Sequence, residues 1–323
     1  MFPALMRSKE HEEADITHLA NLCHNCRGCY YACQYTAPHE FDLNLPAALA
    51  KTRSQSWEKY IWPGIFASAF QKNGLILSVL IALTFGIFLF VIRSINVEGA
   101  GFYAYLSHAL MVTIFLPAFI LPLVVIAVGL VRYVKDTLGR WPGVADMMRA
   151  KLSAARMDNL SGGQGQGCNY EKKEQYSLAR KYAHQSLMWG FVLCFASTAS
   201  GTVLHYGFDM PAPYPFWSFP KLFGVSGGVL MTLGAAALIF QKTKADVHLG
   251  DINAWGGEKA FIWLCLLVAL TGLLLYWIGG AFLLALHLGF VFSFFVTMPY
   301  SKFIHVFFRL AALAVESAKQ RDG

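Results

Sequence analysis

The sequence has little charge, and long stretches of it have none. Only 14% of its 323 residues are charged and 56% are hydrophobic, whereas soluble domains carry about 25% charged residues. Uncharged apolar runs alternate with polar stretches, which is typical of a chain that crosses a bilayer repeatedly. We therefore interpret the net charge of +7 as basic loops on one side of a membrane, and we expect no nucleic-acid partner.

The motifs of several other protein classes are absent from the sequence. Its first 20 residues have no apolar core of the length that a cleavable signal peptide needs. No Ser–His–Asp arrangement, pair of catalytic carboxylates or zinc motif is visible. The apolar runs contain no Asp or Glu, which argues against a proton relay of carboxylates. They contain no Lys or Arg and show no inverted repeat, which argues against an anion transporter.

Six uncharged segments are long enough to cross the hydrocarbon core, which takes roughly 20 helical residues. The fifth and sixth are separated only by Gly279 and Gly280, which predicts a tight helical hairpin. We predict an all-α polytopic membrane protein with six transmembrane helices and an N-terminal ferredoxin-like iron–sulfur segment. The six predicted spans are Gly74–Ile92, Ala109–Val131, Ser186–Leu204, Leu222–Phe240, Ala260–Ile278 and Ala281–Pro299.

Lysine and arginine are distributed unequally between the two sides of this predicted membrane domain. All of the 26 except Arg93 and Lys221 fall in segments that share one side. Because cytoplasmic loops hold the excess of these residues, we expect both termini to be cytoplasmic, in the inner membrane of a bacterium. The predicted parts are a cytoplasmic iron–sulfur segment (1–60), a membrane domain (61–310) with a cytoplasmic loop (132–185), and a cytoplasmic tail (311–323).

Four of the seven cysteines form one run in a polar stretch near the N-terminus. Its spacing, C-x2-C-x2-C-x3-C, is the run by which bacterial-type ferredoxins bind iron–sulfur clusters, whereas zinc sites usually use two separated C-x2-C pairs. The predicted [4Fe–4S] ligands are Cys23, Cys26, Cys29 and Cys33. In two-cluster ferredoxins the fourth cysteine ligates the other cluster. Either all four therefore bind one cluster, or the chain lacks an upstream run that completes two.

Four histidines lie at or near the ends of predicted spans, at heights that match in pairs. His184 and His205 bracket the third span, about 31 Å apart along a helix, and His287 and His305 lie about 27 Å apart if one helix continues through both. With spans that alternate in direction, His184 meets His305 near the cytoplasmic side, and His205 meets His287 near the outer side. Because imidazole is an ordinary axial ligand of haem, two bis-histidine haems would fit.

One further histidine lies at the outer end of the second span. His108 is an alternative outer ligand, or a proton carrier for quinone. We expect one or two haems of the b type, because no C-x-x-C-H attachment motif is present.

At these motifs the chain resembles the tricarballylate-utilisation protein B family, also called the citrate-utilisation protein B family. The resemblance covers essentially the whole chain. The stretch from His287 to His305 is also similar, more loosely, to the haem-bearing helix of nitrate reductase gamma subunits. The motifs that carry the family resemblance are LCHNCRGCYYACQY at 22–35, GCNY at 167–170, CFAST at 194–198, PAPYP at 211–215 and PYSKFIH at 299–305.

The resemblance implies a membrane protein with iron–sulfur and haem b cofactors. Such a protein reoxidises the flavin of a cytoplasmic FAD-dependent dehydrogenase that acts on tricarballylate or a similar acid, and passes the electrons to quinone. The cysteines from Cys23 to Cys33 match the second cysteine run of the family, and members usually carry another run just upstream. A misplaced start or true loss of one cluster would each explain its absence here.

Two alternative functions belong to other classes. A tricarboxylate transporter is the first, and it would purify without colour. The second is a redox-inactive membrane anchor for a dehydrogenase, in which Cys23→Ser would leave substrate-dependent quinone reduction intact.

Overall fold

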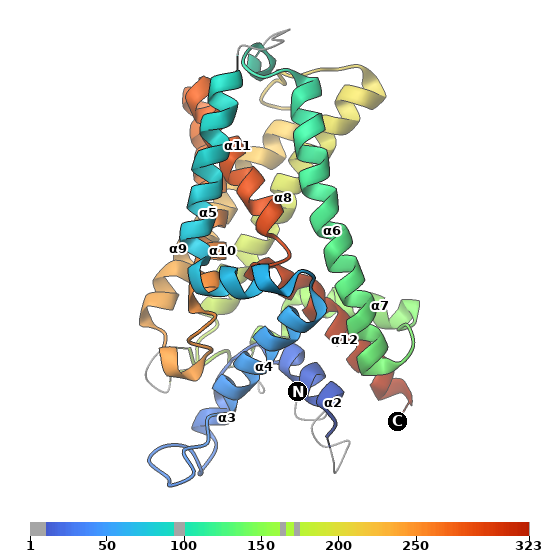
Figure 1. Ribbon diagram of the computed structural model, residues 1–323, viewed down its shortest axis with the longest axis vertical. Helices are drawn as coiled ribbons and strands as arrows, with labels where there is room; N and C mark the ends of the chain where they lie inside the picture. Colours follow the sequence, from blue (N-terminus) through green and yellow to red (C-terminus); the bar gives the residue numbers. More distant parts are fainter. Residues whose placement is uncertain (1–10, 94–100, 162–165, 171–174, 323) are drawn as a thin grey trace.

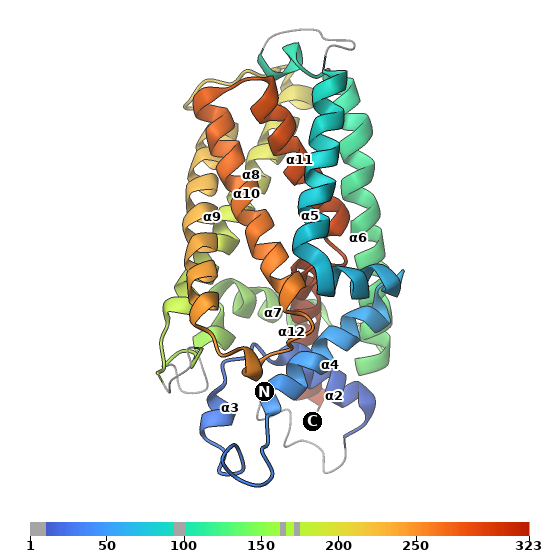
Figure 2. The ribbon, with the colours of Figure 1, turned by 60° about the vertical axis from the view of Figure 1, so that its left-hand side comes forward.

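The computed structural model describes residues 11–93, 101–161, 166–170 and 175–322. Within these residues the chain is helical, and its only β-type pairing is an isolated bridge between Cys168 and Ser177. Long helices form an upright bundle (Figures 1 and 2). They are α5 (Gly64–Ile92), α6 (His108–Leu138), α8 (Ala179–Phe208), α9 (Phe219–Lys244), α10 (Trp255–Ile278) and α11 (Ala281–Thr297).

The length and apolar character of these helices match the predicted class. Five of them are long and apolar enough to cross a membrane, and α11 with the helix that follows it counts as a sixth, bent span. The expected hairpin is confirmed, because α10 ends at Ile278 and α11 begins at Ala281. Between them, Gly279 and Gly280 have φ values of +73° and +96°, which glycine adopts without steric cost. The prediction of an all-α polytopic membrane protein is confirmed.

The last predicted span differs from the structure in one important respect. A single helix was expected to carry both His287 and His305 on one face, but α11 ends at Thr297 and the chain bends by 60° before it continues. Pro299 has no N–H to continue the helix, and the carbonyl of Thr297 accepts turn hydrogen bonds from Tyr300 and Ser301 (3.0 and 2.8 Å). The five-turn register between the two histidines was therefore wrong.

The remaining helices gather at the lower end of the bundle (Figure 1). We call it the basic end, because the segments that hold most of the lysines and arginines lie there. There α12 continues past residue 310, so the predicted tail is helical. These helices are α2 (Glu13–Leu22), α3 (Gly28–Tyr31), α4 (Leu45–Tyr60), α7 (Val144–Arg156) and α12 (His305–Asp322).

Helix α2 is fastened to α12 by polar side chains. The Lys319 ammonium lies 3.0 Å from the Asp15 carboxylate, and His18 Nε2 lies 3.1 Å from Glu316. The other ring nitrogen of His18 lies 3.3 Å from the hydroxyl of Tyr133 on α6. These contacts fix the end of α2, and so the start of the cysteine run, against two other helices.

Helices α8 and α9 pack with their backbones in close contact through glycine. A Cβ atom on Gly190 would lie 2.4 Å from the backbone nitrogen of Met231, and one on Gly234 would lie 2.3 Å from that of Leu187. Small residues of this kind let helices approach closely in membranes. Because α8 carries both His184 and His205, this interface sets the position of two of the predicted haem ligands.

Gly190→Ala is therefore expected to destabilise the protein by about 1–3 kcal/mol, the usual cost of overpacking. Its added methyl group meets backbone, which cannot rotate away. Gly207→Ala on the same helix is the matched control, because its methyl group would meet only Val203 Cγ1, at 3.9 Å. Thermal denaturation of the two detergent-purified variants checks this, and equal melting temperatures would contradict it.

A buried carboxylate joins α7 to α12. Asp146 accepts hydrogen bonds from Ser317 Oγ (3.0 Å), Arg321 Nη1 (2.8 Å) and the backbone N–H of Gly143 (3.0 Å). Burial raises the pKa of Asp146, but these hydrogen bonds and the Arg321 charge together hold the pKa below its ordinary value. A carboxyl with a depressed folded-state pKa stabilises the fold above its unfolded pKa.

The docking of α12 should therefore be constant near neutral pH and weaken only as the pH falls below about 4, through the folded pKa of Asp146. Amide hydrogen exchange in α12 measures this docking at each pH. Asp146→Asn should remove most of the acid-dependent change and raise exchange at pH 7. A midpoint near pH 6, or an acid response that Asp146→Asn leaves unchanged, would show that another group controls the docking.

Candidate functional site

The cysteine run forms a tight loop between α2 and α3 at the basic end. Asn25 and Arg27 have left-handed backbone conformations, with φ of 54° and 65°, and these turn the chain sharply between successive cysteines. The backbone N–H of Asn25 lies 3.4 Å from Cys23 Sγ. An N–H directed at sulfur is the kind of contact that stabilises iron–sulfur clusters.

The first three cysteines lie close enough to influence one another. Burial, followed by the neighbouring thiols of Cys23 and Cys26, raises the pKa of Cys29 to about 11. In the described part of the chain no three Cys, His, Asp or Glu side chains converge on a point that one metal ion would occupy. Thiolates on one zinc ion lie about 4 Å apart, whereas a cubane holds its thiolates on separate iron atoms and so farther apart.

Arginine side chains hold the loop through its backbone and its neighbours. Arg27, which is only 1% exposed, donates to the carbonyls of Tyr170 (2.6 Å) and Asp246 (2.7 Å). Arg53 of α4 donates to the carbonyl of Cys23 at 2.8 Å. The loop is thereby fastened to α4, to the segment around Tyr170 and to the connection between α9 and α10.

Arg180, at the start of α8, binds the same loop. It donates to the carbonyls of His24 (3.2 Å) and Asn25 (3.0 Å). Burial, followed by the charges of Arg309 and Arg180, lowers the pKa of His24 well below its ordinary value. The imidazole inside the cysteine run is therefore neutral at pH 7, and the field around it is positive.

Buried polar atoms at the loop are left without partners among the described residues. They include two donors, Arg27 Nε and Asn169 Nδ2, and one acceptor, Asn25 Oδ1. A buried donor without an acceptor costs about 1–3 kcal/mol. Unpaired donors and arginine charge around clustered thiols fit an anionic sulfur-rich group, so the residues present fit an iron–sulfur cluster.

Two of the predicted haem ligands lie next to one another at the basic end of the bundle. The rings of His184 on α8 and His305 on α12 have centroids 5.9 Å apart and are nearly perpendicular (89°). Two imidazole nitrogens on opposite sides of one metal lie about 4 Å apart, because each metal–nitrogen bond is about 2 Å, and the ring centroids lie farther apart than the nitrogens. The spacing therefore fits a bis-histidine haem.

Both histidines that were expected on the last span use Nδ1 for a hydrogen bond. His305 Nδ1 donates to the carbonyl of Lys302. His287 Nδ1 lies 3.1 Å from Thr271 Oγ1, whose own proton goes to the carbonyl of Leu267 (2.6 Å), so the histidine donates. An imidazole anchored through one nitrogen and left with Nε2 for a metal is the usual arrangement of a ligating histidine.

The outer histidines are arranged differently from the sequence-based pairing. His205 stacks on His108, with ring centroids 4.2 Å apart and an interplanar angle of 23°, and Tyr103 and Tyr206 contact the same rings. Stacked rings do not direct their nitrogens at a common metal. The structure thus brings His108 and His205 together, while the pairing of His205 with His287 stays a prediction.

The cysteine loop and the inner histidine pair are adjacent. Arg180 lies one helical turn, about 5.4 Å, before His184 on α8, and Arg309 lies one turn after His305 on α12. The charge of Arg309 acts on Cys23 and also on both histidines. Arg180 therefore connects the loop to the helix that carries His184, and sequence spacing could not reveal this connection because the two segments are far apart in the chain.

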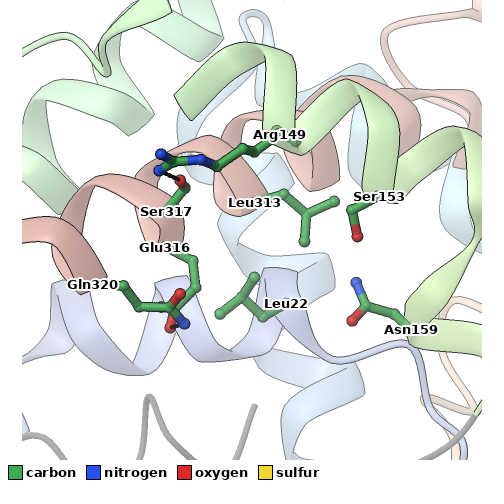
Figure 3. A pocket seen from close by; sticks show the side chains of 9 residues that line it. Leu22, Arg149, Ser153, Asn159, Leu313, Glu316, Ser317 and Gln320 are labelled. Atoms are coloured by element: carbon green, nitrogen blue, oxygen red, sulfur yellow. Dashed lines mark hydrogen bonds between the residues drawn. The ribbon is translucent and has the colours of Figure 1, made fainter. Parts of the chain in front are cut away.

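A cavity of about 260 Å³ lies at the basic end between α2, α7 and α12 (Figure 3). Leu22 and Leu313 line one part of it, and Glu316 and Gln320 another. Arg149 donates to Ser317 at its edge (3.3 Å). Its lining includes no cysteine and no histidine, so it is separate from the candidate site.

Helices of membrane-spanning length, with a cysteine loop at one end, define a polytopic membrane protein with a ferredoxin-like N-terminal segment. The chain belongs to the citrate utilization protein B family: the model of that family matches residues 70–322, and the model of the family's Fer4-like domain matches residues 1–59. Citrate utilization protein B of Escherichia coli is 36% identical over 337 residues, which cover 100% of this chain and 88% of the relative. No solved structure matches the chain.

Proposed function

We propose that this protein serves citrate utilization by carrying electrons from a cytoplasmic FAD-dependent dehydrogenase of tricarballylate- or citrate-type acids to the membrane quinone pool. One observation carries the proposal: Arg180 binds the cysteine loop and lies one turn before His184 on α8, whose ring lies beside that of His305 at the basic end. Because basic residues mark the cytoplasmic side, this is the end that a cytoplasmic flavoprotein would reach.

In this proposal the cysteines would bind an iron–sulfur cluster and the histidines would bind haem. Cys23, Cys26 and Cys29 would supply three thiolates to an iron–sulfur cluster; the sequence-based choice of Cys33 as the fourth ligand stays a prediction. His184 and His305 would bind haem b through imidazole nitrogens. When bound, these groups exchange single electrons, and the protein contributes position, burial and charge.

The surrounding arginines set the electrostatics of this site. Their positive charge favours an anionic cluster, and His184 Nδ1 is a buried ring atom without a hydrogen-bond partner among the described residues. The outer histidines would hold a second haem or adjoin the quinone site.

Quinone reduction in membranes that also contain the partner dehydrogenase tests the proposal. Cys23→Ser should abolish substrate-dependent reduction, and Cys265→Ala, which removes a buried thiol from the membrane core, should not. Unchanged reduction in Cys23→Ser would instead indicate the anchor. Purified protein without iron or haem, but with substrate uptake in vesicles, would indicate the transporter.

A further inference from the structure

We propose that Cys168 is the fourth ligand of the iron–sulfur cluster held by Cys23, Cys26 and Cys29, and that Cys33 is not a ligand of that cluster. The inference rests on the proposed function, in which the cysteine loop holds such a cluster. In the sequence Cys168 stands far from the run, at the end of a glycine-rich stretch that resembles a linker; residues 162–165 of that stretch lie outside the described residues.

The structure places Cys168 against the loop. Cys168 is 2% exposed and belongs to a small buried cluster with Met157 and Leu160, against which Cys26 packs. The residue after it is tied directly to the loop, because the backbone N–H of Asn169 donates to the carbonyl of Cys26 at 2.9 Å. The thiol and the cysteine run therefore share one buried environment.

The backbone around Cys168 is held in a fixed position. It pairs with Ser177 through two hydrogen bonds of 3.0 and 3.1 Å. Gly167 before it has φ +101°, and a Cβ there would lie 2.2 Å from the carbonyl oxygen of Ser177, so only glycine fits. After it, the ring of Tyr170 lies between the guanidinium groups of Arg27 (4.6 Å) and Arg180 (4.2 Å). Such preorganisation suits a ligand rather than a linker.

A buried donor beside Cys168 has no acceptor in the described part of the chain. Asn169 is 0% exposed, its Oδ1 accepts from the N–H of Gln175 (3.1 Å), and its Nδ2 has no partner among the described residues. Arg27 Nε also has no partner among the described residues. Sulfur atoms of a bound cluster would accept from donors at these positions, and hydrogen bonds to sulfur are a normal part of such sites.

Cys33 is partly buried, as Cys26 and Cys29 are, but the chain that follows it is more exposed. It follows α3, which ends at Tyr31, and it leads into residues 34–43, nearly all of which are exposed. In two-cluster ferredoxins with this spacing, the first three cysteines of the run ligate one cluster and the fourth ligates the other cluster. Binding by Cys168 instead forms one iron–sulfur bond and releases the thiol proton to solvent.

Iron and acid-labile sulfide in anaerobically purified protein test the assignment. Wild type is expected to hold about four of each per cluster. Cys168→Ser should lower both about twofold or more, or leave a three-iron cluster visible by EPR. Cys33→Ser and Cys265→Ala should keep the wild-type content and spectrum. The haem content and elution volume of each variant report whether the membrane domain has folded.

A second measurement needs no variant. Alkylation of iron-loaded wild-type protein, followed by mass spectrometry, should modify Cys33 without loss of iron. Protection of Cys33 until iron is released, or a full cluster in Cys168→Ser, would overturn the inference while leaving the proposed function intact. Absence of a cluster from wild type, so that Cys23→Ser changes nothing, would instead defeat the proposed function itself.

Discussion

Replacing His184 by alanine is expected to remove one haem b from the purified protein and to stop substrate-driven quinone reduction. Removal of a residue that only hydrogen-bonds a metal ligand typically lowers metal affinity or activity by about 10–100-fold. Removal of His184 should lower haem binding further, because the ligand itself is lost. The ring centroids of His305 and His184 lie 5.9 Å apart. Replacing His305 by alanine should therefore cause the same loss of haem and of quinone reduction. Pyridine haemochrome spectra and quinone-reduction rates measure both effects.

The two histidines should act as a unit. A double replacement is expected to cause no more loss than either single one, since groups that form one site are not additive. Gln185→Ala is the matched control on the same turn of α8, where the side chain donates to the carbonyl of Arg156 (3.2 Å). Full haem content in either single histidine variant would contradict the inner site.

The outer side should lose its haem when His287 is replaced by alanine. The ring of His287 is anchored through Nδ1 to Thr271. It packs directly against Gly272, where a Cβ atom would lie 3.0 Å from the ring. We expect His287→Ala and His205→Ala each to lower haem b from about two per protein to about one. Difference spectra would identify the haem that disappears.

His108 discriminates between the two possible outer pairs. Its ring is stacked flat on His205, so His108→Ala is expected to keep both haems while changing the environment of the outer one. If His108→Ala removes a haem and His287→Ala does not, the outer pair is His108 with His205. If neither His205 nor His287 is needed, the protein has no outer haem.

Local patterns in the sequence were enough to predict most of the helical framework. Uncharged runs of spanning length mark the bundle because desolvation of charge is costly in a membrane, and Gly279–Gly280 marks the hairpin. Helix α5 begins at Gly64, earlier than expected, and changes direction at Asn73 (φ −118°, ψ 19°). The part of α5 before Gly74 was not predicted because it contains polar residues, and apolar length alone does not show where a helix starts.

Two features of the candidate site were not predicted, the first of them local and the second non-local. The bend between α11 and α12 was missed because equal spacing was interpreted as one helix, although Pro299 was a visible signal against it. The positions of Arg180, Arg309 and Cys168 around the cysteine loop depend on packing among segments far apart in the chain. The motif GCNY was noticed as a pattern, but its thiol could be placed beside Cys26 only in three dimensions.

The most direct test of this account is the amount of haem b per protein in detergent-purified material, expressed with adequate haem supply. The account predicts about two haems per protein, or about one if only the His184–His305 site is occupied, together with iron and sulfide from the cysteine loop. A colourless, folded protein without haem would contradict the membrane half of the electron path and leave the chain as an anchor for its dehydrogenase.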